Sequence, residues 1–280
     1  MIRKFSLRLL ATLPAIWLIL TMVFLLVHIV PGDPVQQMLG EDARAEDVQQ
    51  LRHTLGLDQP IATQYGKYLE HLVRGDWGRS FRFQTPVLKL VLERYPATLE
   101  LALAAMLVCA LIAIPAGVVS ARRRGRASDR TIGFATLLGL SVPNFALGPV
   151  LILAFSIELG WLPVSGRGGW GHLVLPAATL GAALAAILTR MVRSTMIEEL
   201  SSDYVRTARA KGLPERAVLF CHAFPNALVP IVTILGLQFG TLLAGTIVTE
   251  SIFSWPGIGR LTVQAIQARD YPLLQGCILV

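Results

Sequence analysis

Five long apolar stretches restrict what this chain can fold into. They cover residues 9–30, 97–120, 132–157, 173–189 and 227–249. Each approaches or reaches the roughly 20 mainly apolar residues that a helix needs to cross a bilayer. Charged residues make up only 15% of the chain, against roughly 25% in soluble proteins. A soluble domain would instead show apolar stripes at helical spacing. The sequence therefore predicts an all-α polytopic membrane protein.

A sixth apolar stretch, residues 271–280, is shorter than the others. About ten residues of helix extend some 15 Å, which is half of the hydrocarbon core. We therefore expect about six transmembrane helices, with the sixth incomplete in this sequence. The expected parts are residues 1–30, an N-terminal tail and first helix; residues 31–96, an external helical segment; and residues 97–280, the transmembrane domain.

The distribution of basic residues predicts the orientation. They cluster before the first stretch, between the second and third, and between the fourth and fifth: Arg3, Lys4 and Arg8; Arg122, Arg123, Arg124, Arg126 and Arg130; Arg190, Arg193, Arg206, Arg209, Lys211 and Arg216. The positive-inside rule places these segments and the N-terminus in the cytoplasm. It also accounts for the net charge of +7 without a nucleic-acid partner. The first stretch is too long for a cleaved signal peptide, so we expect a retained helix.

The segment of residues 31–96 has the pattern of a small helical cap. Val48, Leu51 and Leu55 share one helical face that Gly56 would end, and a second amphipathic helix begins at Ile61 and ends near Gly75. A third helix is expected to start with Thr85 as its cap and Pro86 in its first position, and to break at Pro96. This cap either packs on the membrane domain or receives an external partner.

The motifs of the common catalytic and cofactor sites are missing from the sequence. There is no G-x-x-x-x-G-K-[ST] loop for ATP, and the five histidines and three cysteines show no metal-binding or disulfide spacing. We expect no cofactor, no metal and no enzymatic activity. Glu100, Glu158 and Glu250 lie near span ends, whereas a proton-coupled carrier would need a titratable group at mid-depth. This argues against a secondary transporter and implies an external energy source.

Two features of the fifth stretch are candidates for a translocation path. Gln238 is its most polar residue, and it either bonds to a neighbouring helix or lines a polar pathway. Gly236 and Gly240 form a small-residue pair that allows helices to approach closely. The pair serves either packing within the chain or a subunit interface along a central pathway.

The loop of residues 194–225 carries the most specific pattern. Ser202 is positioned to cap a short basic helix that begins at Asp203 and that Gly212 ends. Tyr204 and Ala208 can share one face of this helix. A solvated charge run would need neither the small alanines nor the sharp stop, whereas in a docking helix Ala208 would permit close approach and Tyr204 would anchor a partner.

This loop resembles a motif of ABC importer permeases. Arg206-Thr207-Ala208-x-x-x-Gly212 and, ten residues later, His222-Ala223-Phe224-Pro225 keep the spacing of the family's E-A-A-x3-G-x9-I-x-L-P loop, with Arg206 in place of the leading Glu. Further matches to the dipeptide, oligopeptide, glutathione and nickel branch are these: Pro31-Gly-Asp-Pro-Val35, Leu55-Gly-Leu-Asp-Gln-Pro60, Phe253-Ser-Trp-Pro-Gly-Ile-Gly259 and Arg269-Asp-Tyr-Pro272.

The resemblance implies a permease subunit in the bacterial cytoplasmic membrane that works by alternating access. Its expected partners, besides membrane lipid, are a second homologous permease subunit, two cytoplasmic ATPase subunits and an external substrate-binding protein. Asp203, Tyr204, Arg206, Ala208 and Gly212 would couple it to an ATPase, and Pro225 would start the fifth span. The expected solute is a dipeptide or oligopeptide; nickel and glutathione remain alternatives, and a secondary transporter or channel is the alternative from another class.

Overall fold

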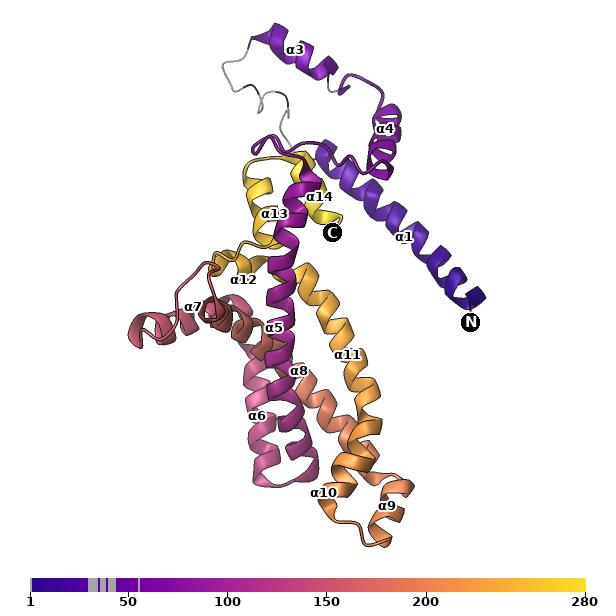
Figure 1. Cartoon of the computed structure of the whole chain (residues 1–280), viewed down its shortest axis with the longest axis vertical. Helices are drawn as coiled ribbons and strands as arrows, with labels where there is room; N and C mark the ends of the chain where they lie inside the picture. The colour runs from indigo at the N-terminus through magenta and orange to yellow at the C-terminus, as the bar shows by residue number, and fades with distance from the viewer. Residues whose placement is uncertain (1, 30–34, 36–38, 40–43, 55) are drawn as a thin grey trace. The chain divides into compact units, whose positions relative to one another are not determined.

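The computed structural model describes residues 2–29, 35, 39, 44–54 and 56–280. Within this part of the chain the structure is helical and contains no β-strand (Figure 1). It divides into two compact units, residues 1–95 with 261–280 and residues 96–260.

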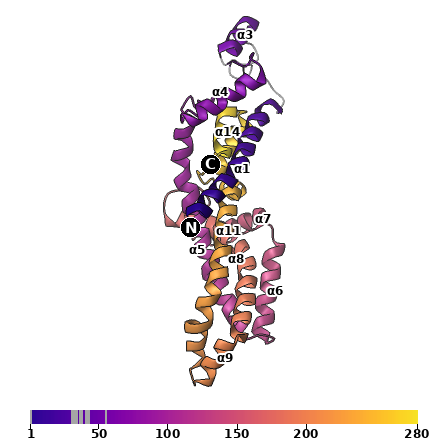
Figure 2. The same cartoon turned by 90° about the vertical axis from the view of Figure 1, so that its right-hand side faces the viewer.

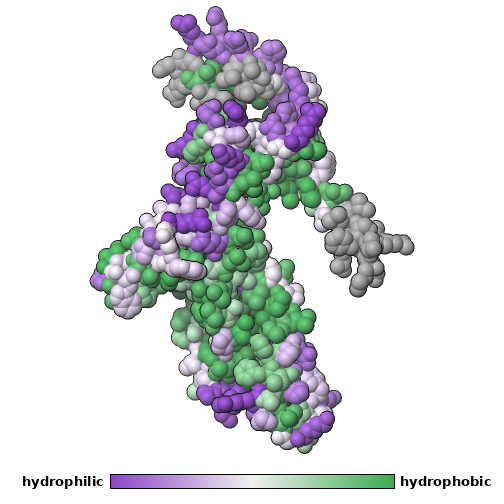
Figure 3. All heavy atoms as spheres, in the orientation of Figure 1, coloured by the Kyte–Doolittle hydropathy of each residue, from purple (hydrophilic) through white to green (hydrophobic). Residues whose placement is uncertain are grey.

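Four long helical segments form most of the second unit: α5 (Val87–Arg122), which begins in the first unit, α6 (Ala127–Ser141), α8 (Trp170–Ser201) and α11 (Phe224–Gly245). α8 contacts both α6 and α11 and lies between them in two views (Figures 1 and 2). The surface over these helices is mainly apolar, with polar residues gathered at the end that carries the loop after α8 (Figure 3).

Small residues bring α5 and α8 into direct contact. A Cβ added at Gly181 would lie 2.7 Å from the Ala105 carbonyl oxygen, and one at Gly117 would lie 2.6 Å from Val192. No side chain larger than hydrogen fits at either position without a shift. Gly181, which lies in the fourth apolar stretch, therefore serves packing between helices of the same chain.

The predicted all-α membrane fold is confirmed, and the part of the chain that the structure describes holds fewer full-length spans than the sequence predicts. Three described helices are long and apolar enough to cross a membrane: α5, α8 and the continuous helix of residues 215–244. The first apolar stretch contributes α1 (Ile2–Ile29), with a shorter apolar segment at Thr12–Leu25, and the last contributes α14 (Tyr271–Ile278).

The third predicted span, residues 132–157, is not one straight helix. α6 ends at Ser141, and the following α7 (Asn144–Leu151) and π-helical η1 (Ile152–Glu158) run at 105° to it. Val142 is extended, with φ −86° and ψ 117°. It precedes Pro143, and the proline ring disfavours the helical conformation of the residue before it. The pair counts as a fourth crossing only if both arms belong to one broken span.

The expected break at Pro96 is wrong, because α5 continues through both Pro96 and Pro115. The helix just after Pro96 is well packed: Ala97, Leu101 and Ala102 are fully buried in a cluster with Trp255. The Trp255 indole N–H also donates to the Ala97 carbonyl, at 2.8 Å. Membrane helices tolerate a proline when neighbouring groups replace the lost interactions.

The remaining elements of the second unit are short. The helices α9 (Asp203–Ala210) and α10 (Glu215–Ala217) and the π-helical η2 (Val218–Ala223) lie between α8 and α11. After α11 come α12 (Ile247–Ile252) and α13 (Ile258–Gln267), and α13 continues into the first unit.

The first unit contains the two amphipathic helices expected in the external segment, α3 (Ala45–Thr54) and α4 (Ile61–Val73). Gly56 and Gly75 follow them with φ of +67° and +78°, the left-handed conformation that glycine adopts at helix ends. The hydroxyl groups of Tyr65 in α4 and Thr21 in α1 form a hydrogen bond at 2.7 Å. Residue 55 and most of the Pro31–Val35 motif lie outside the described residues.

The third helix of this segment begins at Val87, not with Thr85 as its cap. The Thr85 hydroxyl donates to the Phe83 carbonyl oxygen at 2.9 Å, and the Leu90 N–H at the start of the helix donates to the Pro86 carbonyl oxygen. Residues 79–86 instead form a compact turn held by Asp270. Its carboxylate accepts from the Ser80 hydroxyl at 2.5 Å and from the Arg82 backbone N–H at 3.1 Å.

Candidate functional site

The loop singled out by the sequence folds into a short helix held between two long ones. α8 ends at Ser201, α9 follows at once, and Gly212 turns the chain with φ +79°. Ser202 occupies the N-cap position with extended backbone angles, as expected. Its hydroxyl donates to the Glu199 carbonyl oxygen at 2.6 Å but accepts no N–H from α9, so the predicted side-chain cap is not formed.

One face of α9 packs against the rest of its own chain. Val205 and Ala208 are buried in a cluster that includes Val218, Leu219 and Ala223 of η2. Ala208 does permit close approach, but the neighbours are helices of this subunit. The Ala208 methyl group is therefore covered by helices of this subunit, and a docking role for Ala208 stays a prediction.

Tyr204 fastens α9 to its flanking helices. Its hydroxyl donates to the Glu199 carboxylate at 2.5 Å and lies 3.4 Å from the His222 carbonyl oxygen. About 40% of the residue stays exposed. The ring is therefore available to a partner, although its hydroxyl is already engaged within the chain.

Arg209 holds the same helix from its other end, a role that the sequence analysis missed. Its Nε donates to Glu215 at 2.7 Å, and a terminal nitrogen donates to the Leu200 carbonyl at 3.2 Å. The end of α8, α9 and the start of α10 are thus joined through one guanidinium group. Pairing across an irregular turn has no fixed sequence spacing, which is why no pattern revealed it.

The outward surface of α9 is charged. Asp203 and Arg206 form an ion pair at 3.3 Å, and their side chains are 92% and 77% exposed. Such an exposed pair stabilises a helix by only about 0.3–0.5 kcal/mol. Asp203 and Arg206 are therefore available for contacts with another protein at little cost to the helix.

Pro225 does not start the fifth span, in contrast to the prediction. The helix begins at Glu215 and continues through η2 into α11. The wider π-helical turn lies directly before Pro225, where the proline ring and its missing N–H disturb a regular α-helix. Pro225 thus marks a change of helical pitch within one long helix.

The candidate path residues of α11 fall into two groups. Gln238 is buried between helices; its amide nitrogen lies 3.4 Å from the Leu184 carbonyl, and its oxygen lies 3.8 Å from the Cys109 sulfur. These contacts favour the helix-bonding alternative for Gln238. Gly236 and Gly240 differ, because a Cβ added at either would meet nothing within 4 Å. Their face is not used for packing within this chain.

A buried carboxylate organises the segment after α11. Glu250 is 0% exposed and accepts from the hydroxyls of Thr98 at 2.8 Å and Thr246 at 3.0 Å. The Arg260 backbone N–H donates to it at 2.9 Å. In the sequence, Glu250 is recognisable only as an acidic residue near a span end. Among the described residues, no group of three or more His, Cys, Asp and Glu side chains could hold a metal ion.

Comparison with known proteins identifies the family. Residues 113–280 match the family described as binding-protein-dependent transport system inner membrane component, and residues 1–102 match the N-terminal domain of the same transport systems. This chain belongs to that family. The permease is thus a multi-pass inner-membrane subunit of an ABC importer and is not itself the ATPase, which is a separate subunit.

The permease is also similar to named proteins over nearly its whole length. It is 44% identical over 273 residues to the glutathione transport system permease protein GsiC of Escherichia coli K12, covering 98% of this chain and 89% of that protein. The same values hold for GsiC of Shigella flexneri serotype 5b. An inward-facing structure of the MetNI methionine ABC transporter shares the fold, with a TM-score of 0.54 at 19% identity, covering 69% of this chain and 90% of that one.

The family assignment confirms the resemblance drawn from the residues 206–225 motif. It also confirms that an ATPase and a substrate-binding protein belong to the working importer. No observation tests the roles of the individual loop residues, so the coupling function of α9 stays a prediction.

Proposed function

We propose that this permease carries a small peptide across the inner membrane, with glutathione as the first substrate to test. The supporting observation is the 44% identity to glutathione permeases over 98% of the chain. Glutathione is itself a short peptide, so this proposal narrows the dipeptide or oligopeptide expectation without leaving its chemical class. Nickel import is the alternative from the same branch.

The proposed mechanism is alternating access driven by two separate ATPase subunits. α9 would transmit their closure, with Asp203, Tyr204 and Arg206 as its outward contacts and Gly212 as the turn that fixes its angle. α8 and α11 extend directly into this loop, so a displacement of α9 would reach both membrane helices. The tight attachment through Tyr204 and Arg209 supports this role, because a loosely tethered helix would absorb the motion.

A second homologous permease subunit is the proposed partner along α11. The face of Gly236 and Gly240 has open space in this chain, and paired small residues let helix backbones approach closely in membranes. We assign this face to the subunit interface beside the pathway.

Uptake into proteoliposomes tests the substrate. The complete importer, with both permease subunits and its ATPases, would be reconstituted with its binding protein outside and ATP inside. We expect ATP-dependent accumulation of radiolabelled glutathione, which unlabelled glutathione should suppress more strongly than dipeptides or Ni²⁺. Accumulation of a dipeptide or of nickel without glutathione would reject this substrate.

The proposed orientation predicts the accessibility of two engineered cysteines. In a Cys221→Ser background, which removes the one exposed native thiol, Gln49→Cys should react with an impermeant maleimide in spheroplasts. Ser128→Cys should react only after the membrane is opened. The reverse pattern would place α9 outside and exclude coupling to a cytoplasmic ATPase.

A further inference from the structure

A basic pocket lies between α6 and α8, close to the turn that joins α5 to α6. It encloses about 520 Å³, and its lining includes Arg130, Arg190 and Arg193 together with Asp129. Ser120, Thr136, Thr189 and Ser194 also line it. Apart from Ser194 at the start of the loop of residues 194–225, no lining residue belongs to the coupling loop or to the candidate path.

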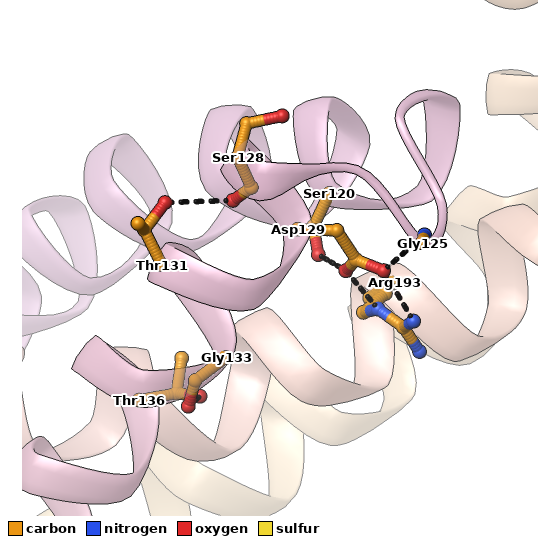
Figure 4. Close-up of polar contacts among 8 residues, drawn as sticks. All are labelled: Ser120, Gly125, Ser128, Asp129, Thr131, Gly133, Thr136 and Arg193. Carbon is orange, nitrogen blue, oxygen red and sulfur yellow. Dashed lines mark hydrogen bonds and ion pairs between the residues drawn. The ribbon is translucent and has the colours of Figure 1, made fainter.

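Asp129 and Arg193 form the rigid wall of the pocket. Arg193 donates to the Asp129 carboxylate through Nε at 2.7 Å and through a terminal nitrogen at 2.9 Å (Figure 4). The same carboxylate accepts from the Ser120 hydroxyl at 2.5 Å and the Gly125 N–H at 2.8 Å. Four donors therefore hold a carboxylate whose side chain is only 8% exposed. Arg193 is thereby fixed in place with its guanidinium partly open to the pocket.

The remaining charge of the pocket is positive. Three arginines and one carboxylate line it, which leaves a net charge of +2. Arg130 and Arg190 are exposed, and no acidic partner is found for either within the described ranges. Clustered like charges repel each other, and an anion bound between them would relieve this repulsion. Arginine forks match phosphate oxygens well, because they donate two parallel hydrogen bonds.

The location of the pocket favours a lipid as the source of the phosphate. Ser120 lies two residues before the end of the apolar helix α5, beside the basic turn that follows it, and the positive-inside rule places such a span end near the cytoplasmic headgroups. Along α6 the pocket passes into an apolar surface, where Phe134, Leu137 and Leu138 are 64%, 56% and 51% exposed. A phosphate between the arginines would thus have acyl chains beside these residues.

We propose that this pocket binds the phosphate group of an acidic phospholipid such as phosphatidylglycerol. Arg130 and Arg190 contact the phosphate, Asp129 holds Arg193 in position beside it, and the acyl chains follow α6. Basic pockets between membrane helices near the cytoplasmic face are suited to anionic headgroups. Gly133 keeps the site open, since a Cβ added there would meet nothing within 4 Å.

Lipid retention by the purified importer tests this inference. The complex would be exchanged into nanodiscs of phosphatidylcholine with one-fifth phosphatidylglycerol, re-extracted into mild detergent, and its retained lipids counted by native mass spectrometry. We expect preferential retention of phosphatidylglycerol. Arg190→Gln should lower this retention about fivefold, which corresponds to about 1 kcal/mol per basic side chain. Gly133→Leu should lower it by filling the pocket without changing the charge.

Arg124→Gln is the matched control, because it removes an equal charge from the nearby turn but not from the pocket lining. It should retain lipid like the unaltered importer, and all variants should elute as intact complexes. Gly133→Ala provides a smaller blocking change if Gly133→Leu fails to assemble. Equal retention in all variants, or no preference over phosphatidylcholine, would overturn the proposal. Displacement of the lipid by millimolar inorganic phosphate would assign the pocket to free phosphate instead and reject the lipid.

Discussion

Gly257→Ala is expected to destabilise the second unit of the permease far more than the single-methyl change Gly236→Ala. A Cβ at this position would overlap the Glu250 carboxyl group. Glu250 cannot turn away without losing the donors Thr98, Thr246 and the Arg260 N–H, all within 3.0 Å. Overpacking alone costs about 1–3 kcal/mol, and an unpaired buried polar group adds about as much again. We expect a total loss of about 3 kcal/mol or more in the free energy of unfolding.

The measurement is the thermal unfolding midpoint of the purified permease in detergent, together with its yield in membranes. Gly236→Ala is the matched control, since its added methyl group meets open space within the chain. That variant should unfold within a few degrees of the unaltered protein, whereas Gly257→Ala should unfold far earlier or fail to accumulate. Equal midpoints for the two variants would show that the Glu250 carboxylate is free to move.

A companion change separates steric overlap from hydrogen bonding. Thr98 donates to Glu250 and also accepts from the Ile258 N–H at 2.8 Å. Thr98→Val keeps the volume and removes both interactions, so its cost should be about 1–3 kcal/mol. A Thr98→Val effect that matched the Gly257→Ala effect would indicate that hydrogen bonding, and not overlap, dominates at this site.

Features of the fold that depend on local chemistry could be predicted from the sequence. Long apolar runs predicted α5, α8 and α11, because span length is a property of one segment. Gly56, Gly75 and Gly212 were expected at helix ends, and all three have positive φ. Glycine is a direct indicator of such turns, because other residues adopt a positive φ only at a cost in conformational energy.

Features set by contacts between distant segments were not predictable. Glu250 is satisfied by Thr98, 152 positions away, and Asp129 by Arg193, 64 positions away, so neither pair leaves a spacing pattern. The continuation of α5 through Pro96 depends on packing against residues such as Trp255. In each case contacts between distant segments, and not local propensity, determine the structure.

The inward face of α9 shows the same limit within the candidate site. Sequence spacing grouped Tyr204 and Ala208 on one face but could not say which way that face points. Val205 and Ala208 are buried against η2, while Tyr204 stays about 40% exposed and Asp203 and Arg206 face outward. The surface through which an ATPase would act is therefore more charged than the sequence suggested.

Gly212→Val is expected to abolish most transport while leaving the permease in the membrane. Gly212 has φ +79°, and a Cβ added there meets nothing within 4 Å. The cost of the substitution therefore comes from the backbone. A non-glycine residue with this positive φ destabilises the turn by about 1–2 kcal/mol, and a β-branched residue destabilises it more. The chain would relieve this strain by changing the turn, which would shift α9 relative to Glu215 and α11.

The expected result is a fall in substrate uptake of at least about fivefold, the factor that corresponds to 1 kcal/mol. ATP hydrolysis should also lose its response to loaded binding protein. The long helices on either side of the turn do not depend on it, so membrane levels should stay near normal. Uptake in proteoliposomes, ATPase stimulation and immunoblots of membrane fractions measure the three quantities.

Gly212→Asn is the control that separates backbone conformation from side-chain size. Asparagine tolerates the left-handed region far better than valine, and its side chain is of comparable bulk. If the turn fixes the angle of α9, Gly212→Asn should keep most of the transport that Gly212→Val loses. Equal loss in both variants would indicate that a partner packs against Gly212 itself. Normal transport by Gly212→Val, with an intact ATPase response, would show that α9 does not couple the permease to ATP hydrolysis.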